Sequence, residues 1–196
     1  MNVVIIKYNA GNIQSVLYCL ERLGMQAVVT DEETAIRKAD KVIFPGVGEA
    51  SSAMNYLTEK GLDRVIRNLE QPVLGICLGM QLLCRHSEEN DTTCLNVFDE
   101  QVLKFQPGPS HLKVPQIGWN TLSHLRSPLF KGLAEQSYVY FVHSYYVEMS
   151  LHTIATAEYG ITYSAALQKG NFYGVQFHPE KSALAGETIL KNFLAL

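Results

Sequence analysis

The sequence of 196 residues has few cysteines, and they lack the spacings that usually bind zinc. Its four cysteines, Cys19, Cys77, Cys84 and Cys94, form no Cys-x-x-Cys pair. The chain also lacks a basic N-terminal region followed by an apolar run, and it has no apolar stretch of about 18 residues. We therefore expect a cytoplasmic protein with reduced thiols, without a structural metal ion and without a membrane-spanning segment.

Positive charge is scarce as well. The 16 Lys and Arg residues stand against 19 Asp and Glu, a formal net charge of −3. A nucleic-acid-binding domain usually carries a basic excess, so we expect no nucleic-acid partner. A chain of this size buries roughly 70% of its unfolded surface and can fold without a disulfide or metal ion. We expect one domain spanning residues 1–196, and no cofactor.

The first half of the chain alternates short apolar runs with helical patterns. The predicted strands are residues 3–6, 27–30, 41–44 and 72–76. The predicted helices are residues 13–23, 32–38 (with Asp31 as N-cap) and 78–86, with one or two more within 50–68. This alternation predicts an α/β fold, with a mostly parallel central sheet and helices on both faces. Sites in such sheets form at the carboxyl ends of strands, where the loops 45–48 and 75–79 fall.

The second half has short strand patterns separated by Gly, Pro and Ser. These strands are predicted at residues 112–114, 138–142, 145–147, 153–157, 165–168 and 173–176. Their spacing indicates antiparallel hairpins, and a helix is predicted at residues 184–194.

The strongest chemical signal is Cys77, in the segment Gly75-Ile76-Cys77-Leu78-Gly79 between a strand and a helix. A nucleophile on such a sharp turn needs small neighbours, and the two glycines meet that need. The adjacent helix N-terminus favours the thiolate. The alternative is a buried structural cysteine that has two glycines nearby by chance.

A thiol nucleophile needs a base, and that base needs an orienting group. His178 and Glu180 lie in the segment 176–182 after the last predicted strand. The proline after His178 favours an extended backbone there, so both side chains point to the same side. Glu180 could then hold the imidazole in the correct tautomer. Taken alone, this segment is also compatible with an ordinary surface loop.

An acyl-transfer site also needs backbone N–H groups to stabilise the oxyanion. The N–H of Leu78, directly after Cys77, is one expected donor. Val47 or Gly48, in the loop Pro45-Gly46-Val47-Gly48, is the expected second donor. Considered in isolation, the loop could equally be a turn that ends a strand.

Together these segments resemble the class I (triad) glutamine amidotransferases over nearly the whole chain. Three further segments narrow the resemblance: residues 8–15, Gly118-Trp119-Asn120 and residues 140–145. Within the class, the chain resembles the glutaminase subunits of imidazole glycerol phosphate synthases, which act in histidine biosynthesis.

The resemblance implies that Cys77 attacks the side-chain amide of glutamine while His178, oriented by Glu180, transfers protons. It implies that the glutamine-binding residues are Gly46, Gln81, Glu89 and Ser144. It also implies that ammonia passes to a (β/α)8-barrel cyclase subunit, which forms imidazole glycerol phosphate and an aminoimidazole carboxamide ribotide. The matching positions near that subunit interface are Trp119, Tyr140 and Lys181.

Two positions depart from the family pattern. Gln116 stands where the family often has His, and Lys7 stands where Asp is common. Neither belongs to the expected triad, so we expect an altered interface or signalling rather than lost catalysis.

Three other functions remain compatible with the residues. The chain could be the glutaminase subunit for aminobenzoate (anthranilate) or pyridoxal phosphate synthesis, or a stand-alone cysteine hydrolase of similar fold. It could also be a non-catalytic scaffold, although the intact Cys77, His178 and Glu180 disfavour that interpretation.

Overall fold

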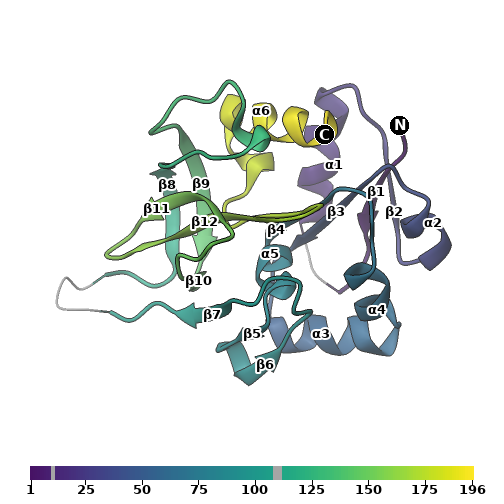
Figure 1. The fold of residues 1–196 in the computed structure, drawn as a ribbon, viewed down its shortest axis with the longest axis horizontal. Helices are drawn as coiled ribbons and strands as arrows, with labels where there is room; N and C mark the ends of the chain where they lie inside the picture. Colours follow the sequence, from purple (N-terminus) through teal and green to yellow (C-terminus); the bar gives the residue numbers. More distant parts are fainter. Residues whose placement is uncertain (10–11, 108–111) are drawn as a thin grey trace.

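The computed structural model of the protein describes residues 1–9, 12–107 and 112–196. Residues 10 and 11, in the segment 8–15 named above, lie outside the described residues. Within the described residues, eleven strands form one sheet and two strands form a second, smaller sheet (Figure 1). The spatial order in the large sheet is β2-β1-β3-β4-β13-β12-β10-β7-β5-β6, with β11 paired to β12.

For the elements predicted in the first half, the observed bounds lie close to the predicted ones. The strands of the large sheet are β1 (Val3–Ile6), β2 (Ala27–Thr30), β3 (Lys41–Gly46), β4 (Val73–Cys77), β5 (His86–Ser87), β6 (Thr92–Thr93), β7 (Gln101–Lys104), β10 (Tyr145–Val147), β11 (Thr153–Glu158), β12 (Thr162–Lys169) and β13 (Phe172–Val175). The small sheet contains β8 (Gln116–Thr121) and β9 (Tyr138–His143). The helices are α1 (Ile13–Arg22), α2 (Glu33–Arg37), α3 (Ala50–Glu59), α4 (Leu62–Arg67), α5 (Leu78–Leu83) and α6 (Ala183–Leu194), with short 3-10 turns η1 (Glu89–Asp91), η2 (Pro128–Phe130) and η3 (Pro179–Lys181).

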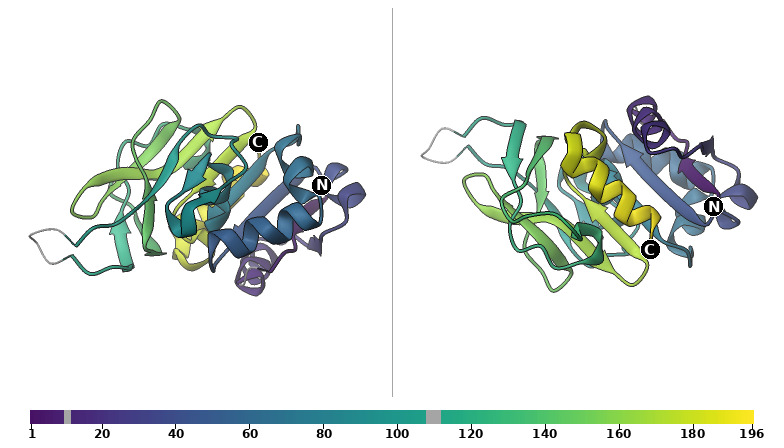
Figure 2. Two further views of the ribbon diagram at one scale, coloured as in Figure 1. Left: turned by 90° about the horizontal axis from the view of Figure 1, so that it is seen from below. Right: turned by 90° about the horizontal axis from the view of Figure 1, so that it is seen from above.

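Strands β2, β1, β3, β4 and β13 pair in parallel, and helices cover both faces of this part of the sheet. Because successive side chains of a strand point to opposite faces of the sheet, each strand packs against both helical layers. In β1, Val4 and Ile6 pack with the helices α2 to α5, whereas Val3 and Ile5 pack with α1 and α6. Seen from below and from above, the molecule shows α3 in front of the sheet in one view and α6 in the other (Figure 2). The predicted α/β fold is confirmed.

The hairpins predicted for the second half are also confirmed. Strand β12 pairs antiparallel with β10, β11 and β13, and β8 pairs antiparallel with β9. The strand predicted at residues 112–114 is wrong, because this segment is irregular. The strands β5, β6, β7 and β8 were not predicted. In β8 only Ile117 and Trp119 are apolar, and the glycine and polar residues around them leave too short an alternation to stand out as a strand.

Two helix boundaries also differ from the prediction. Helix α5 ends at Leu83, because Cys84 is extended and the chain turns there into β5. Asp31 does not cap α2, which begins at Glu33 with Glu32 in the N-cap position and no side-chain cap. The hydroxyl of Thr30 instead accepts the N–H of Glu32 at 3.0 Å.

Candidate active site

Cys77 is the last residue of β4 and directly precedes α5. Its φ of 54° and ψ of −109° lie far from strand and helix values, so the backbone turns sharply at the sulfur. A non-glycine residue held in such a conformation is strained, and strain of this kind is concentrated at functional sites. This is the strand-turn-helix geometry that the sequence predicted for a nucleophile.

The two glycines around Cys77 are required by close packing. A Cβ on Gly79 would lie 1.8 Å from the carbonyl oxygen of Phe44, and a Cβ on Gly75 would lie 2.8 Å from the backbone nitrogen of Met80. Both contacts are with backbone atoms, which cannot rotate away. The turn can therefore press α5 against β3 and β4 only because these positions lack side chains.

The loop after β3 lies beside Cys77 because the parallel register pairs Gly46 with Cys77. Gly46 has no room for a side chain, since a Cβ would lie 2.0 Å from the hydroxyl oxygen of Tyr8. That hydroxyl donates to the carbonyl of Pro45 at 2.6 Å and fixes the end of the strand. Gly48 has a φ of 128°, which favours glycine.

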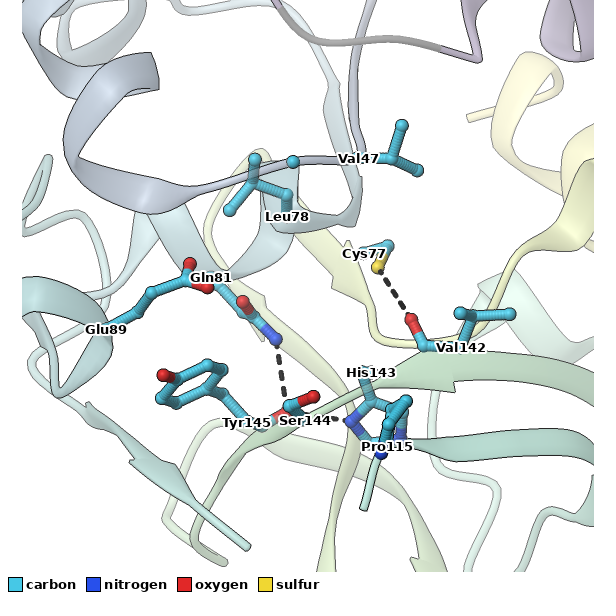
Figure 3. A pocket seen from close by; sticks show the side chains of 11 residues that line it. Val47, Cys77, Leu78, Gln81, Glu89, Pro115, Val142, His143, Ser144 and Tyr145 are labelled. Carbon is cyan, nitrogen blue, oxygen red and sulfur yellow. Dashed lines mark hydrogen bonds between the residues drawn. The ribbon is translucent and has the colours of Figure 1, made fainter.

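A cavity of about 250 Å³ opens beside Cys77. Seven of the predicted site residues line it: Val47, Gly48, Cys77, Leu78, Gln81, Glu89 and Ser144. Figure 3 shows all of them except Gly48 converging from the loop after β3, the turn between β4 and α5, η1 and the end of β9, together with Val142, His143 and Tyr145. Gly46, the last residue of β3, directly precedes Val47 and is buried. The cavity thus joins a nucleophile, candidate oxyanion donors and polar groups for a small ligand.

The carboxylate of Glu89 accepts one hydrogen bond from within the protein. Its Oε2 accepts the N–H of Ala50 at 2.8 Å, at the start of α3. Burial raises the pKa of this carboxyl group, the Ala50 N–H lowers it, and the nearby Glu49 raises it again, with a net increase. The group lines the cavity, so an ammonium group of a ligand would find a carboxylate on this wall.

His178 and Glu180 lie behind Cys77, buried and outside the cavity lining. The ring Nδ1 of His178 lies 2.8 Å from Oε1 of Glu180. A carboxylate accepts, so Nδ1 carries the hydrogen and Nε2 is left for Cys77. Glu180 Oε1 also accepts from the Asn12 side chain at 2.6 Å, whereas its Oε2 is buried without a partner among the described residues.

The pKa of His178 depends on its two neighbours, Cys77 and Glu180. Burial lowers the pKa of the ring, but interactions with the side chains of Cys77 and then Glu180 raise it, and the net pKa lies above the ordinary value. Interactions with Cys77 and Glu180 therefore favour the protonated ring. The structure brings together the three side chains that the sequence singled out, although Cys77 lies more than 100 residues before the other two.

Two of the predicted interface residues, Trp119 and Tyr140, lie on one face of the small sheet. Trp119 is 53% exposed and stacks edge-to-face with Tyr140 at a centroid distance of 5.8 Å. Ile117 and Tyr138 are exposed beside them at 63% each. Lys181 is exposed in η3, which contacts β9. We call the side chains of Ile117, Trp119, Tyr138 and the half-buried Tyr140 the aromatic face.

Comparison with known proteins identifies the family. The model of class I glutamine amidotransferases matches residues 4–196. The imidazole glycerol phosphate synthase subunit HisH of Bacteroides fragilis is 59% identical over 196 residues, which cover 100% of both chains. The subunit of the same name from Bacteroides thetaiotaomicron is 56% identical, again over 100% of both chains.

The chain belongs to the HisH family of class I glutamine amidotransferases. Solved structures more distant from this HisH-family chain share the fold alone. A crystal structure of a glutamine amidotransferase superposes with a TM-score of 0.76 at 18% identity, covering 99% of this chain and 98% of the other. A glutamine amidotransferase of Thermotoga maritima superposes with a TM-score of 0.66 at 18% identity, covering 100% of this chain and 83% of the other.

Three groups that contact the candidate triad of this HisH-family chain were not predicted from the sequence. Asn12 donates to Glu180, the carbonyl of Val142 accepts from Cys77 Sγ at 3.7 Å, and Gln176 Nε2 donates to the same sulfur at 3.7 Å. Gln176 stands two residues before His178 in an extended segment, so both side chains lie on the same side. This two-residue spacing could have predicted that Gln176 lies near the triad. The other two contacts depend on tertiary packing.

Within the described residues of the chain, no helix is long and apolar enough to cross a bilayer. In the same residues no three His, Cys, Asp or Glu side chains gather as a metal site would require. Of the two departures from the HisH-family pattern, Lys7 is exposed and Gln116 is buried. The amide of Gln116 lies 3.1 Å from Nε2 of His143.

His143 is a buried ring on the cavity wall. Its Nδ1 donates to the carbonyl of Tyr145 at 2.7 Å. Burial lowers its pKa, the hydrogen bond to Tyr145 raises it and the nearby His178 lowers it, and the net pKa is about 4. The folded protein therefore holds this ring neutral at pH values where an unfolded chain protonates it.

His143 should make the protein sensitive to acid. The folded pKa lies below the unfolded value, so its contribution falls as pH drops below about 6.5 and is lost near pH 4, a total of about 3 kcal/mol. In a His143→Asn variant, whose amide can still donate to the Tyr145 carbonyl, this part of the pH dependence disappears. Urea unfolding of both proteins from pH 4 to pH 7 checks it, and parallel curves would contradict the expectation.

Proposed function

We propose that the chain is the glutaminase subunit of an imidazole glycerol phosphate synthase, where it hydrolyses glutamine to glutamate and ammonia. Membership of the HisH family supports the pathway. The observation that carries the chemistry is the proximity of Cys77, on its strained turn, to the hydrogen-bonded His178–Glu180 pair, beside a small cavity with several polar groups on its wall. We further propose that residues 1–196 form one domain, which the match over residues 4–196 supports.

The proposed reaction begins with the Cys77 thiolate attacking the carbonyl carbon of the glutamine side chain. The negative charge that develops on the oxygen is stabilised by the N–H of Leu78 and by that of Val47 or Gly48, which all line the cavity. The tetrahedral intermediate collapses to a thioester as the C–N bond breaks. His178 gives its proton to the departing nitrogen, and ammonia leaves.

In the second half of the reaction a water molecule attacks the thioester. His178 takes a proton from this water, glutamate is released, and the thiolate of Cys77 and the protonated His178 are restored. Glu180 holds the ring throughout through Nδ1. Glutamine would be held by polar groups of the cavity wall, with Gln81, Glu89 and Ser144 as the contacts and Gly46 giving its backbone space to approach.

The partner in this proposal is the (β/α)8-barrel cyclase subunit, and its docking surface is the aromatic face with Lys181. Large exposed aromatic side chains are typical anchors of protein interfaces. The same strand that presents Tyr140 also holds the catalytic groups, because the carbonyl of Tyr140 accepts the N–H of His178 and the carbonyl of Val142 accepts from Cys77. Docking on β9 can therefore reach the active site through two backbone contacts.

Because the chain also resembles other glutaminase subunits, the assay of glutamate release compares the barrel partner with an alternative partner. We expect glutamate release to be low for the isolated chain, low or moderate with the barrel partner, and high when that partner also holds its ribotide ligand. Equal rates in the three conditions would contradict partner activation. Stimulation by a chorismate-using partner instead would assign the chain to aminobenzoate synthesis, and full turnover alone would make it a stand-alone hydrolase.

The proposed location is the cytoplasm. The four cysteines are buried and unpaired, which fits a reducing compartment.

A further inference from the structure

Gln176 is a buried residue that contacts the nucleophile but is not a member of the triad. It follows β13 in the chain, is fully buried, and reaches toward the nucleophile. Its Nε2 lies 3.7 Å from Cys77 Sγ, a distance suited to the large sulfur atom. Its Oε1 lies 2.9 Å from Nε2 of Gln81. One amide thus connects the sulfur to a residue of the cavity wall.

The direction of these hydrogen bonds can be deduced from one carbonyl. Gln81 Nε2 lies 3.1 Å from the backbone oxygen of Tyr145, and a carbonyl oxygen can only accept (Figure 3). The side-chain nitrogen of Gln81 must therefore face Tyr145. Its second hydrogen points to Gln176, so the atom of Gln176 that faces it must be the oxygen.

The rest of the chain of bonds follows. With its oxygen facing Gln81, the amide of Gln176 can present only its nitrogen to Cys77. The sulfur therefore receives an N–H donor. The carbonyl of Val142 also lies 3.7 Å from this sulfur, and it can accept only from the neutral thiol. Among these two neighbours, Gln176 favours the thiolate and Val142 favours the thiol.

We propose that Gln176 is a functional part of the glutaminase site: it donates a hydrogen bond to Cys77 Sγ, which orients the sulfur and stabilises the thiolate, and Gln81 and the Tyr145 carbonyl fix the direction of this bond. The inference rests on the proposed role of Cys77. It also assigns a direction to Gln81. Both hydrogens of its nitrogen are used, so only its Oε1 remains for a ligand, and that oxygen binds an N–H group of glutamine.

Two variants separate this role from simple packing. Gln176→Met has a similar shape but neither donates nor accepts. Gln176→Glu keeps an oxygen for Gln81 and replaces the donor with an oxygen that repels a thiolate. The matched control is Gln168→Met, which removes a half-buried amide that contacts Ser127 and Tyr173 away from the cavity.

The experiment measures the rate of Cys77 alkylation by iodoacetamide from pH 5 to pH 10, with the modified residue identified by peptide mass spectrometry. The other three cysteines are buried, so their modification reports unfolding instead. We expect the midpoint of the pH dependence to rise by about one unit in Gln176→Met, and further in Gln176→Glu. Gln168→Met should match the unaltered protein.

The kinetic expectation is a fall in kcat of about tenfold or more in Gln176→Met, measured in the complex, with a smaller change in KM. An unchanged midpoint in both Gln176 variants, in proteins that remain folded at the assay temperature, overturns the proposal. Because alkylation needs no glutamine, this outcome is separate from a failure of the proposed function. That failure would appear as glutaminase activity that survives loss of the Cys77 sulfur.

Discussion

Replacing Cys77 with alanine should reduce glutamate release by at least about 10⁴-fold, because no other side chain of the cavity wall can form the thioester. The cavity is lined otherwise by backbone, apolar groups and polar groups without a nucleophilic sulfur. The variant should fold, since alanine removes only one atom, and that atom borders the cavity. The measurement is glutamate release by the complex with the barrel partner and its ribotide ligand.

Two controls make this result specific. Cys84→Ala removes a fully buried sulfur directly after the end of α5, the helix that Cys77 precedes. The Sγ of Cys84 lies 3.6 Å from the carbonyl of Met80. It should cost stability but leave the rate of glutamate release unchanged. Added ammonium should restore synthase activity to the Cys77→Ala complex, because the partner then needs no glutaminase. A Cys77→Ala protein that still releases glutamate would refute the nucleophile assignment.

The parallel half of the fold could be predicted because its signals are local. The apolar run of β1 and the helical pattern of α1 give the element type without any knowledge of neighbours. Gly24, with a φ of 74°, ends α1 as expected, and its N–H binds the carbonyl of Glu21. Strand β8 has only a weak signal, because Ile117 and Trp119 are its only apolar residues. It exists because each of its residues pairs with one of β9, from Gln116 with His143 to Thr121 with Tyr138.

The candidate site divides in the same way. The turn at Cys77 could be predicted because Gly75 and Gly79 lie within two residues of the nucleophile. The pairing of His178 with Glu180 could be predicted because an extended segment puts them on one side. The link from Gln176 through Gln81 to Tyr145 could not, since its two hydrogen bonds join residues that are 95 and 64 positions apart. Only the packed sheet shows that these groups meet.

A single methyl group added at Gly79 should cause a large loss of stability. In Gly79→Ala the new Cβ would lie 1.8 Å from the carbonyl oxygen of Phe44 and 2.8 Å from its carbonyl carbon. Both are backbone atoms of β3, so either the strand or α5 must move. We expect the free energy of unfolding to fall by roughly 3 kcal/mol or more, measured by urea denaturation.

Activity should fall further than stability in this variant. A shift of α5 away from β3 moves the N–H of Leu78 and the turn at Cys77, so the oxyanion donor and the nucleophile lose their alignment with His178. We expect kcat to fall at least about 100-fold even at temperatures where Gly79→Ala remains folded.

The control is Gly61→Ala, at a site with a φ of 70° and nothing within 4 Å of the added Cβ. It tests backbone strain without a clash and should cost about 1–2 kcal/mol with kcat unchanged. If Gly79→Ala proved as stable and as active as Gly61→Ala, the close packing of α5 against β3 would not be what holds the Cys77 turn.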